Sequence, residues 1–528
     1  MGSRYRNVAE KLALQWAGVT PAAAEHRVLS FLPYLRHEPP TQNQTGNKVE
    51  TPSSKDGQGS LTSVDPTQQG DVTANSVGDP YGPRRWRSSM VQLSGKNRAL
   101  NELSVERLGE ETDQHLVMLH GYGAGLGFFY KNFEPLTRAQ GWHLYALDML
   151  GMGRSTRPPF RIKAKNREDA IREAEAWFVD ALEEWRVKRK VDRFTLLGHS
   201  LGGYMAVAYA LKYPGHLNKL ILASPVGVPE DPHAVREEVP EQPQTTTMAS
   251  EFTQDQQLVM DERDVTGSNT TDALRTYRTI NDKKKDLDAG VSSRVADKTG
   301  NSTPDAPPRR TLPKWFAYLW DANISPFTFI RWAGPLGPRL VSGWSYRRFS
   351  HLPVEEAKAL HTYSYTVFRM RGSGEFALAY ILAPGAYARS PLIRRIHEVG
   401  RQIVQQSPME ETTNSTAATP SPPTPSQSLS PVHLNEASAQ PKRENGVPVV
   451  FLYGDHDWMD VGGGYAAKEK IDQERERVLR NATPEERKAD KGTAKVIVIK
   501  RSGHHVYLDG WEEFNKVVLD EMEDVRKQ

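Results

Sequence analysis

Short runs of apolar residues recur along the chain, and turn-forming residues close each run. Runs of this kind suit the strands of a parallel sheet that helices bury on both faces. Six runs predict core strands, at residues 115–120, 142–148, 194–199, 219–225, 448–454 and 495–501. Two further segments, 86–94 and 98–107, are typical of antiparallel strands that precede such a sheet.

The residues between the second and third of these runs have the period of a helix. Over 167–190, apolar side chains fall at spacings of 3, 4, 4 and 3, at Ile171, Ala174, Phe178, Leu182 and Trp185. A stripe with that spacing packs one face of a helix on a sheet. Strands that alternate with helices predict a doubly wound α/β fold.

Long polar segments interrupt this pattern. Residues 38–84 and 405–446 are rich in Ser, Thr, Gln, Gly and Pro, and we expect them to be disordered because they bury too little apolar surface to offset chain entropy. The predicted organisation is a helical or anchoring segment 1–37, a disordered segment 38–84, a first core part 85–230, a cap 231–404 with a flexible insertion 282–310, a disordered linker 405–446 and a second core part 447–528.

Composition excludes several kinds of chemistry. The 528 residues carry a formal charge of only +3, which gives no indication of a nucleic-acid partner. The chain has no cysteine, so disulfides, thiolate metal sites and a cysteine nucleophile are excluded. No metal-ligand spacing is visible, and we expect neither a metal nor an organic cofactor. No apolar run reaches the roughly 18 residues of a membrane-spanning helix.

The most specific chemical motif is Gly198-His199-Ser200-Leu201-Gly202, which lies between a predicted strand and the helical stretch YMAVAYALKY. In this context Gly-x-Ser-x-Gly is a nucleophile elbow, a strained turn that exposes a serine. Small neighbours are needed because the strand and the helix approach closely there. Ser200 is therefore the candidate nucleophile.

A serine nucleophile needs a base and an acid that orients the base. In a fold with this elbow the acid comes first along the chain and the histidine follows. Asp457, after the strand 448–454, is the preferred acid, and Asp455 and Asp460 compete with it. His504, after the strand 495–501, is the preferred base, and the adjacent His505 competes with it.

An acyl-transfer site also needs N–H donors for the oxyanion. The glycine-rich segment 120–125 follows the first core strand, and the backbone N–H of Tyr122 or Gly123 is a candidate donor. The second candidate is the N–H of Leu201, the residue after the nucleophile. Together these parts predict an α/β-hydrolase fold: a mostly parallel, doubly wound sheet with an inserted helical cap and long disordered insertions.

The chain between Pro225 and Pro448 is much longer than the sheet requires, so most of it is expected to form a cap. Residues 313–349 hold ten aromatic side chains, and five Lys or Arg against one acid. Aromatic residues with interspersed cations suit a membrane interface with anionic head groups. The aromatics can equally pack the cap on the core, and the two readings are compatible.

The motifs resemble those of the lipid-metabolising α/β-hydrolases, which include the lipid-droplet lipase co-activator, N-acyl-phospholipid lipases and fungal cardiolipin-specific phospholipases. The shared segments are HGYGAGLGFFYKNFEPL (120–136), GHSLGGYMA (198–206), SPFTFIRWAGPLGPRLV (325–341), RGSGEFA (371–377) and GHHVYLD (503–509). The polar insertions and YGDHDWMD (453–460) look most like the fungal branch.

The resemblance implies a serine hydrolase of glycerophospholipids, a cardiolipin-type phospholipase or deacylase that contacts membranes through its cap. It also implies two alternatives. Family members carry a His-x4-Asp element associated with acyl-CoA-dependent acylation of lysophosphatidic acid, matched here by His504 and Asp509. The base role explains His504 better, and Asp509 can instead buttress the following segment. The co-activator branch lacks the elbow serine, so Ser200 argues against a non-enzymatic lipid-binding role.

A cardiolipin substrate points by analogy to a peripheral position on a mitochondrial membrane. The basic residues of segment 4–36 fit an import presequence, a surface anchor or a first helix, but Glu10 and Glu25 count against a presequence. The cytoplasm and the lipid-droplet surface are the other expected locations.

Overall fold

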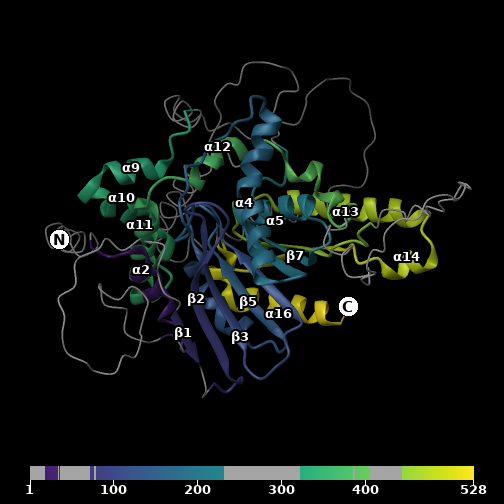
Figure 1. Cartoon of the computed structure of the whole chain (residues 1–528), viewed down its shortest axis with the longest axis horizontal. Coiled ribbons are helices and arrows are strands. Elements are labelled where there is room, and N and C mark those ends of the chain that lie inside the picture. The colour runs from purple at the N-terminus through teal and green to yellow at the C-terminus, as the bar shows by residue number, and fades with distance from the viewer. Residues whose placement is uncertain are drawn as a thin grey trace, which may run out of the picture.

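A computed structural model of the chain describes residues 18–33, 35, 72–75, 79–230, 322–383, 387–404 and 443–527. Its centre is a nine-stranded sheet in the order β1-β2-β3-β5-β4-β6-β7-β8-β9 (Figure 1). The strands are β1 (Val72–Asn75), β2 (Arg84–Gln92), β3 (Ala99–Arg107), β4 (Gln114–Leu119), β5 (Trp142–Leu147), β6 (Phe194–His199), β7 (Leu217–Ala223), β8 (Val449–Gly454) and β9 (Ala494–Ile499).

The six strands β5, β4, β6, β7, β8 and β9 run parallel, and β1, β2 and β3 join them as antiparallel neighbours. The eight strands expected from apolar runs all form, with ends that move by at most two residues. The mostly parallel sheet and the α/β-hydrolase fold predicted from the sequence are confirmed. Strand ends move because fraying and packing, rather than the apolar pattern, decide the last hydrogen bond.

Three stretches of the segments expected to be disordered are ordered. Residues 79–84, at the end of 38–84, include the first residue of β2 and the buried ion pair of Asp79 with Arg84. Strand β1 lies inside 38–84 and pairs antiparallel with β2, so the prediction is wrong for those four residues. Residues 443–446 lie inside 405–446, and Arg443 forms an antiparallel bridge with Ile403. Strand β1 and residues 443–446 are held by backbone hydrogen bonds to residues elsewhere in the sequence, and composition cannot predict such bonds. The rest of 405–446 and the insertion 282–310 lie outside the described residues.

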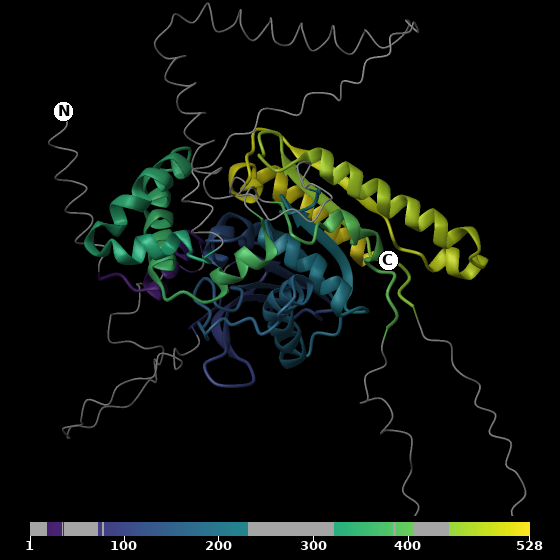
Figure 2. The same ribbon diagram turned by 90° about the horizontal axis from the view of Figure 1, so that it is seen from above.

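Helices cover both faces of the sheet (Figures 1 and 2). Side chains at alternate positions of a strand enter opposite cores: Val117 and Leu119 of β4 face one core, and Leu116 and Met118 face the other. The helices on the first face are α4 (Arg167–Arg189), α5 (Leu201–Lys212) and α13 (Val461–Arg480). The helices on the second face are α2 (Pro21–Leu29), α3 (Tyr130–Leu136), α15 (Val506–Asp509) and α16 (Trp511–Arg526).

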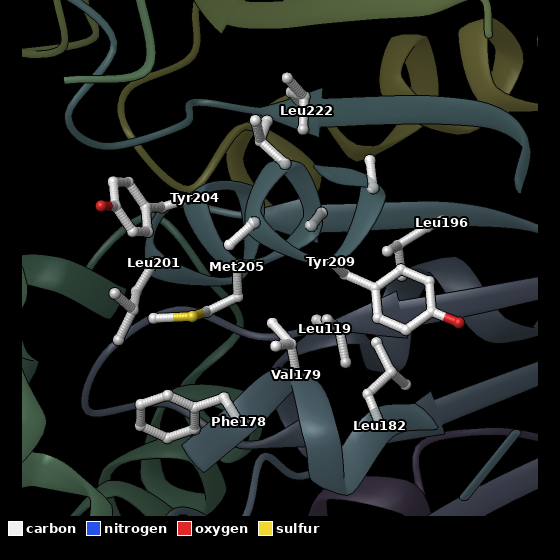
Figure 3. Packing of buried hydrophobic residues seen from close by; sticks show 14 of the residues in the cluster. Leu119, Phe178, Val179, Leu182, Leu196, Leu201, Tyr204, Met205, Tyr209 and Leu222 are labelled. Atoms are coloured by element: carbon white, nitrogen blue, oxygen red, sulfur yellow. The ribbon is translucent and has the colours of Figure 1, made fainter. Parts of the chain in front are cut away.

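Helix α4 follows the expected stripe. Its five predicted apolar positions are buried, and Figure 3 shows Phe178, Val179 and Leu182 facing Met205 and Tyr209 of α5. Each fully buried side chain of this size contributes about 1.5–3 kcal/mol of burial free energy. This packing seats α5, and therefore the turn before it, firmly on the sheet.

The described part of the predicted cap lies between β7 and β8. It consists mainly of α9 (Pro326–Trp332), α10 (Gly337–Phe349), α11 (Val354–Arg369) and α12 (Leu378–Ile381). Helices α9, α10 and α11 gather at one end of the sheet, beside α2, and α13 with α14 (Pro484–Ala489) extends at the other (Figure 2). Cap residues 231–321 lie outside the described part of the chain. Within the described ranges, no helix has the length and apolar character that a membrane crossing needs.

Candidate active site

Ser200 occupies the turn between β6 and α5. Its backbone has φ +52° and ψ −115°, a conformation that residues other than glycine rarely adopt. Its N–H donates to the Ala223 carbonyl at 2.9 Å. The flanking residues must be glycines because neighbouring backbone leaves no room for a side chain. A Cβ on Gly198 would lie 2.3 Å from the Gly202 carbonyl oxygen, and a Cβ on Gly202 would lie 2.6 Å from the carbonyl oxygens of β4 and its following residue. The motif therefore forms the strained elbow predicted from its spacing.

The glycine-rich segment after β4 packs against this turn. A Cβ on Gly121 would lie 2.8 Å from Nδ1 of His199 and 3.1 Å from the Ser200 Cβ, so only glycine lets the two loops approach. His120 holds the segment from behind, because its Nε2 accepts the Met149 N–H at 3.1 Å. Burial lowers the pKa of His120 to about 4, which keeps this ring neutral and able to accept.

Asp457 and His504 form a buried pair at the ends of neighbouring strands. Asp457 follows β8 and His504 follows β9, and the two strands are parallel partners. The His504 Nδ1 lies 3.1 Å from Oδ1 of Asp457, and 7% and 0% of the two side chains are exposed. Burial raises the pKa of Asp457, but His504, together with hydrogen bonds from Ser224 and the Met459 N–H, outweighs burial and the net shift is downward. An ionised Asp457 keeps the His504 proton on Nδ1 and leaves Nε2 able to accept a proton.

The three competing candidates have other partners. Asp455 accepts the Ser502 N–H at 3.0 Å and lies 2.7 Å from Nδ1 of His456. His505 accepts from Nε of Arg348, in cap helix α10, at 2.8 Å. Asp460 caps α13, where it accepts the Gly462 N–H at 2.9 Å. Of the three acids and two histidines left open by the sequence, the structure therefore joins Asp457 to His504.

Ser200 and His504 line the same narrow cavity, of about 30 Å³. Among the described residues no hydrogen bond joins the Ser200 hydroxyl to His504; such bonds are often long in a site without substrate and tighten when it binds. The other lining residues are Tyr122, His199, Leu201, Val226, Leu378, Leu382, Trp458 and His505. The candidate nucleophile and the candidate base, whose ring is bonded to a carboxylate, thus line one cavity, which is the arrangement that acyl transfer needs.

The expected oxyanion donors lie at or beside this cavity. Leu201 is the first residue of α5, where backbone N–H groups have no partner inside the helix. Tyr122 lines the cavity, and its ring stacks on Phe327 of α9 with centroids 5.2 Å apart. Gly123 does not line the cavity; it has φ +69°, and a Cβ there would lie 3.0 Å from the Phe327 ring.

Asp509 does not line the cavity either. Its carboxylate accepts the Gly503 N–H at 3.1 Å and pairs with Arg348 at 3.0 Å. In the His-x4-Asp element, Asp509 therefore contacts the N–H of Gly503, the residue before His504. The His504 ring itself is hydrogen-bonded to Asp457.

Several cavity residues were not identified from the sequence. The Trp458 ring lies 4.9 Å from the His504 ring, and Leu378 and Leu382 come from α12 and its end. Trp458 directly follows the predicted acid, so its position next to Asp457 was a usable signal. The two leucines had none, because only the return of the cap over the sheet places them there.

Comparisons with known proteins agree with this fold. A family model described as "alpha/beta hydrolase fold" matches residues 114–329. The chain is 28% identical, over 84% of its length and 73% of the relative's, to a protein named 1-acylglycerol-3-phosphate O-acyltransferase from Arabidopsis thaliana. It is 40% identical, over 30% of its length and 42% of the relative's, to a Mus musculus protein named 1-acylglycerol-3-phosphate O-acyltransferase ABHD5.

A third relative carries a hydrolase name. The chain is 24% identical, over 81% of its length and 84% of the relative's, to a (lyso)-N-acylphosphatidylethanolamine lipase from Bos taurus. These relatives confirm the resemblance drawn from the sequence motifs, and they do not test its fungal branch. The chain has the α/β-hydrolase fold, and it resembles proteins named for lipid substrates.

Proposed function

We propose that the protein is a serine hydrolase that releases acyl chains from glycerophospholipids, with cardiolipin-type lipids as its substrates. One observation carries this proposal: Ser200 and the Asp457–His504 pair come from three separate loops and meet at one cavity. The lipid class rests on the relatives, which are named for glycerolipid and N-acylphospholipid substrates. The cardiolipin head group rests on the motif resemblance to the fungal branch.

The proposed reaction has two acyl-transfer steps. His504 takes the Ser200 hydroxyl proton as the oxygen attacks the ester carbonyl, and Asp457 stabilises the resulting imidazolium. The backbone N–H of Leu201, with that of Tyr122 or Gly123, stabilises the oxyanion. The proton passes to the departing lysolipid oxygen. Water then attacks the acyl-serine ester, with His504 again as base, and the fatty acid leaves.

The first experiment compares the purified protein with its Ser200→Ala variant on liposomes of cardiolipin, phosphatidylcholine and phosphatidylethanolamine. Lysolipids and fatty acids are quantified by mass spectrometry, with and without acyl-CoA. We expect lysocardiolipin from the wild type without acyl-CoA, and a loss of rate on the order of 10⁶-fold in the variant. Equal turnover by the two proteins would refute the assignment of Ser200.

A second function, acyl-CoA-dependent acylation of lysophosphatidic acid, is favoured by the names of the plant and mouse relatives. An acyl-serine intermediate can pass its acyl group to a lysolipid hydroxyl instead of water. Re-esterification of added lysolipid only with acyl-CoA, and no release of lysolipid, would select this function. A non-enzymatic effect on a partner lipase that survives Ser200→Ala would select the co-activator role.

We also propose that the cap contacts the membrane. Cap helices α9 and α10 and the turn between them carry large apolar side chains at the surface, namely Phe329, Trp332, Leu336, Leu340 and Tyr346, which we call the apolar cap face. Trp332 is 71% and Tyr346 is 77% exposed. Of the basic residues, Arg331 pairs with Glu375 and Arg348 with Asp509, whereas Arg339 is exposed. Exposed aromatics next to a cation suit an anionic lipid surface.

Vesicle flotation tests the apolar cap face. We expect the Trp332→Ala, Leu340→Ala double variant to bind cardiolipin-containing vesicles at least about tenfold more weakly, because each lost side chain removes buried apolar area at the interface. Tyr465→Ala, which removes an exposed aromatic from α13, is the matched control and should bind like the wild type. Equal binding by all three proteins would place the membrane contact elsewhere.

For localisation we propose a peripheral position on a mitochondrial membrane, supported by the cardiolipin analogy and the basic N-terminal segment. Fractionation of cells that express the C-terminally tagged chain tests it. Recovery in the cytoplasm or on lipid droplets would contradict this location.

A further inference from the structure

The turn that carries His504 is tied to the cap by an ion pair. Asp509 ends the one-turn helix α15, and its Oδ2 accepts the N–H of Gly503, the residue before His504, at 3.1 Å. Nη2 of Arg348 donates to both carboxylate oxygens of Asp509, at 3.0 and 3.2 Å. The two side chains are only 12% and 15% exposed, so solvent screens the pair weakly.

Arg348 also holds the residue that follows His504. Its Nε donates to Nδ1 of His505 at 2.8 Å, so one guanidinium holds His505 directly and Gly503 through Asp509. The backbone of His504 itself is held by the elbow, because its carbonyl lies 3.0 Å from Nε2 of His199. These contacts determine where the His504 backbone lies relative to Ser200.

We propose that Arg348 and Asp509 are positioning residues that hold His504 in line with Ser200, an inference that rests on the proposed serine-hydrolase function. The His-x4-Asp element then has a physical role that needs no acyl-CoA: the aspartate orients the backbone of the base. Asp509 acts through Gly503 and Arg348, and it is not among the residues that line the cavity.

The pair also links the cap to the base. Arg348 lies on α10, the helix that carries Leu340 and Tyr346 of the apolar cap face. Because a helix moves as a rigid unit, a displacement of the apolar cap face also displaces Arg348. Movement of α10 therefore moves the Arg348–Asp509 contact that holds His504. A displacement of about 1 Å at a reacting group costs on the order of 100-fold in rate.

The test measures the reactivity of Ser200 without a lipid substrate. The second-order rate of labelling by a fluorophosphonate is determined for the wild type, Arg348→Gln, Asp509→Asn and the double variant, with hydrolysis of a soluble p-nitrophenyl ester in parallel. We expect each single variant to lose roughly 10- to 100-fold in labelling rate and in kcat, with KM unchanged, because the base is displaced and the cavity is not. The double variant should lose no more than the worse single one, because both remove the same contact.

Two controls separate positioning from general damage. Glu355→Gln removes an exposed ion pair with Lys358 on α11 and should keep wild-type rates. Arg348→Lys keeps the charge but lacks the planar guanidinium that contacts both His505 and Asp509, so it should recover only part of the lost rate. Hydrogen exchange of the peptide 502–509 should rise in Arg348→Gln and Asp509→Asn, whereas thermal unfolding confirms that both variants are folded.

The outcomes are distinct. Wild-type labelling in folded Arg348→Gln and Asp509→Asn, or unchanged exchange over 502–509, would overturn the inference. Losses that add in the double variant would also overturn it, because the two residues would then act separately. An Asp509→Asn variant that labels normally but loses only acyl-CoA-dependent transfer would assign Asp509 to transfer instead. A wild type that does not label at all would refute the proposed function itself.

Discussion

Two aspartates that are two positions apart have different surroundings. Asp457 is buried against His504. Asp455 instead accepts the N–H of Ser502, shortly after β9, and pairs with the exposed His456. Burial raises the pKa of Asp455, but the backbone N–H groups of Arg501 and Ser502 outweigh it and lower the pKa to about 2. At the scale of single residues, the choice of acid therefore depends on partners that share no local sequence pattern.

Asparagine substitutions should separate the two acids. We expect Asp457→Asn to lower kcat on the order of 10⁴-fold, because the amide no longer keeps the His504 proton on Nδ1. Asp455→Asn should stay within about threefold of wild type, since its carboxylate does not contact His504. Steady-state kinetics on a soluble ester measures both. A large loss in Asp455→Asn alone would reverse the assignment.

The lowered pKa of Asp455 also predicts a pH-dependent stability. Its pKa is about 2 in the folded chain against an ordinary value of 3.8, so ionised Asp455 stabilises the fold above about pH 4. That contribution is lost as pH falls from 4 towards 2. The difference in unfolding free energy between wild type and Asp455→Asn should thus be constant between about pH 5 and 7 and shrink at about pH 3. Urea unfolding at these pH values measures it; a difference that grows in acid would contradict the shift.

At the scale of elements, helix α2 supports the segment that holds candidate oxyanion donors. Glu25 of α2 is fully buried and binds Arg154 at 2.5 Å and the Tyr363 hydroxyl of α11 at 3.2 Å. Asp148, which adjoins this group, accepts the Leu126 N–H at 2.6 Å. The glutamate that counts against a presequence in the sequence is therefore a core residue, and α2 connects the cap to the site.

Removal of this buried carboxylate should destabilise the fold. We expect Glu25→Ala to lower the unfolding free energy by about 3–5 kcal/mol, because it breaks a buried ion pair with Arg154. Glu355→Ala, on the exposed surface of α11, should leave the unfolding free energy close to that of the wild type. Chemical denaturation measures both. Similar values for the two variants would show that α2 is only loosely attached to the core.

At the scale of the whole molecule, paired residues of the core flank one long polar segment. Two pairs join the residues before segment 405–442 to those after it. Ile403 forms an antiparallel bridge with Arg443, and the Glu444 N–H donates to the Gln402 carbonyl. Antiparallel partners have Cα atoms about 5 Å apart, a gap that a tight turn closes. We therefore predict that a tight turn can close the chain at this point.

Replacement of residues 405–442 by a four-residue Asn-Gly turn should preserve the fold and the site. A shorter loop costs less entropy to close, so we expect an unfolding free energy equal to or up to about 2 kcal/mol above that of the wild type. Fluorophosphonate labelling of Ser200 should be unchanged. Loss of stability or labelling would show that the segment makes contacts that the core requires.

The sequence by itself determined the elements, because their signals are local. Apolar runs predicted β4 to β9, a stripe of spacing 3 and 4 predicted α4, and the glycines around Ser200 predicted the elbow. Residues that follow β8 and β9 narrowed the choice of acid to three aspartates and the choice of base to two histidines. The roles of these residues stay predictions until the variants are measured.

Only the tertiary structure decided which distant groups meet. It joined Asp457 rather than Asp455 to His504, brought Leu378 and Leu382 to the cavity, and placed Asp509 on Arg348. It also divided the cap aromatics, with Phe327 and Trp344 in the core and Trp332 and Tyr346 exposed. The reason is physical: spacing along the chain reports which residues share one face of an element, whereas contacts between elements depend on how packed layers and connecting loops return to the same place.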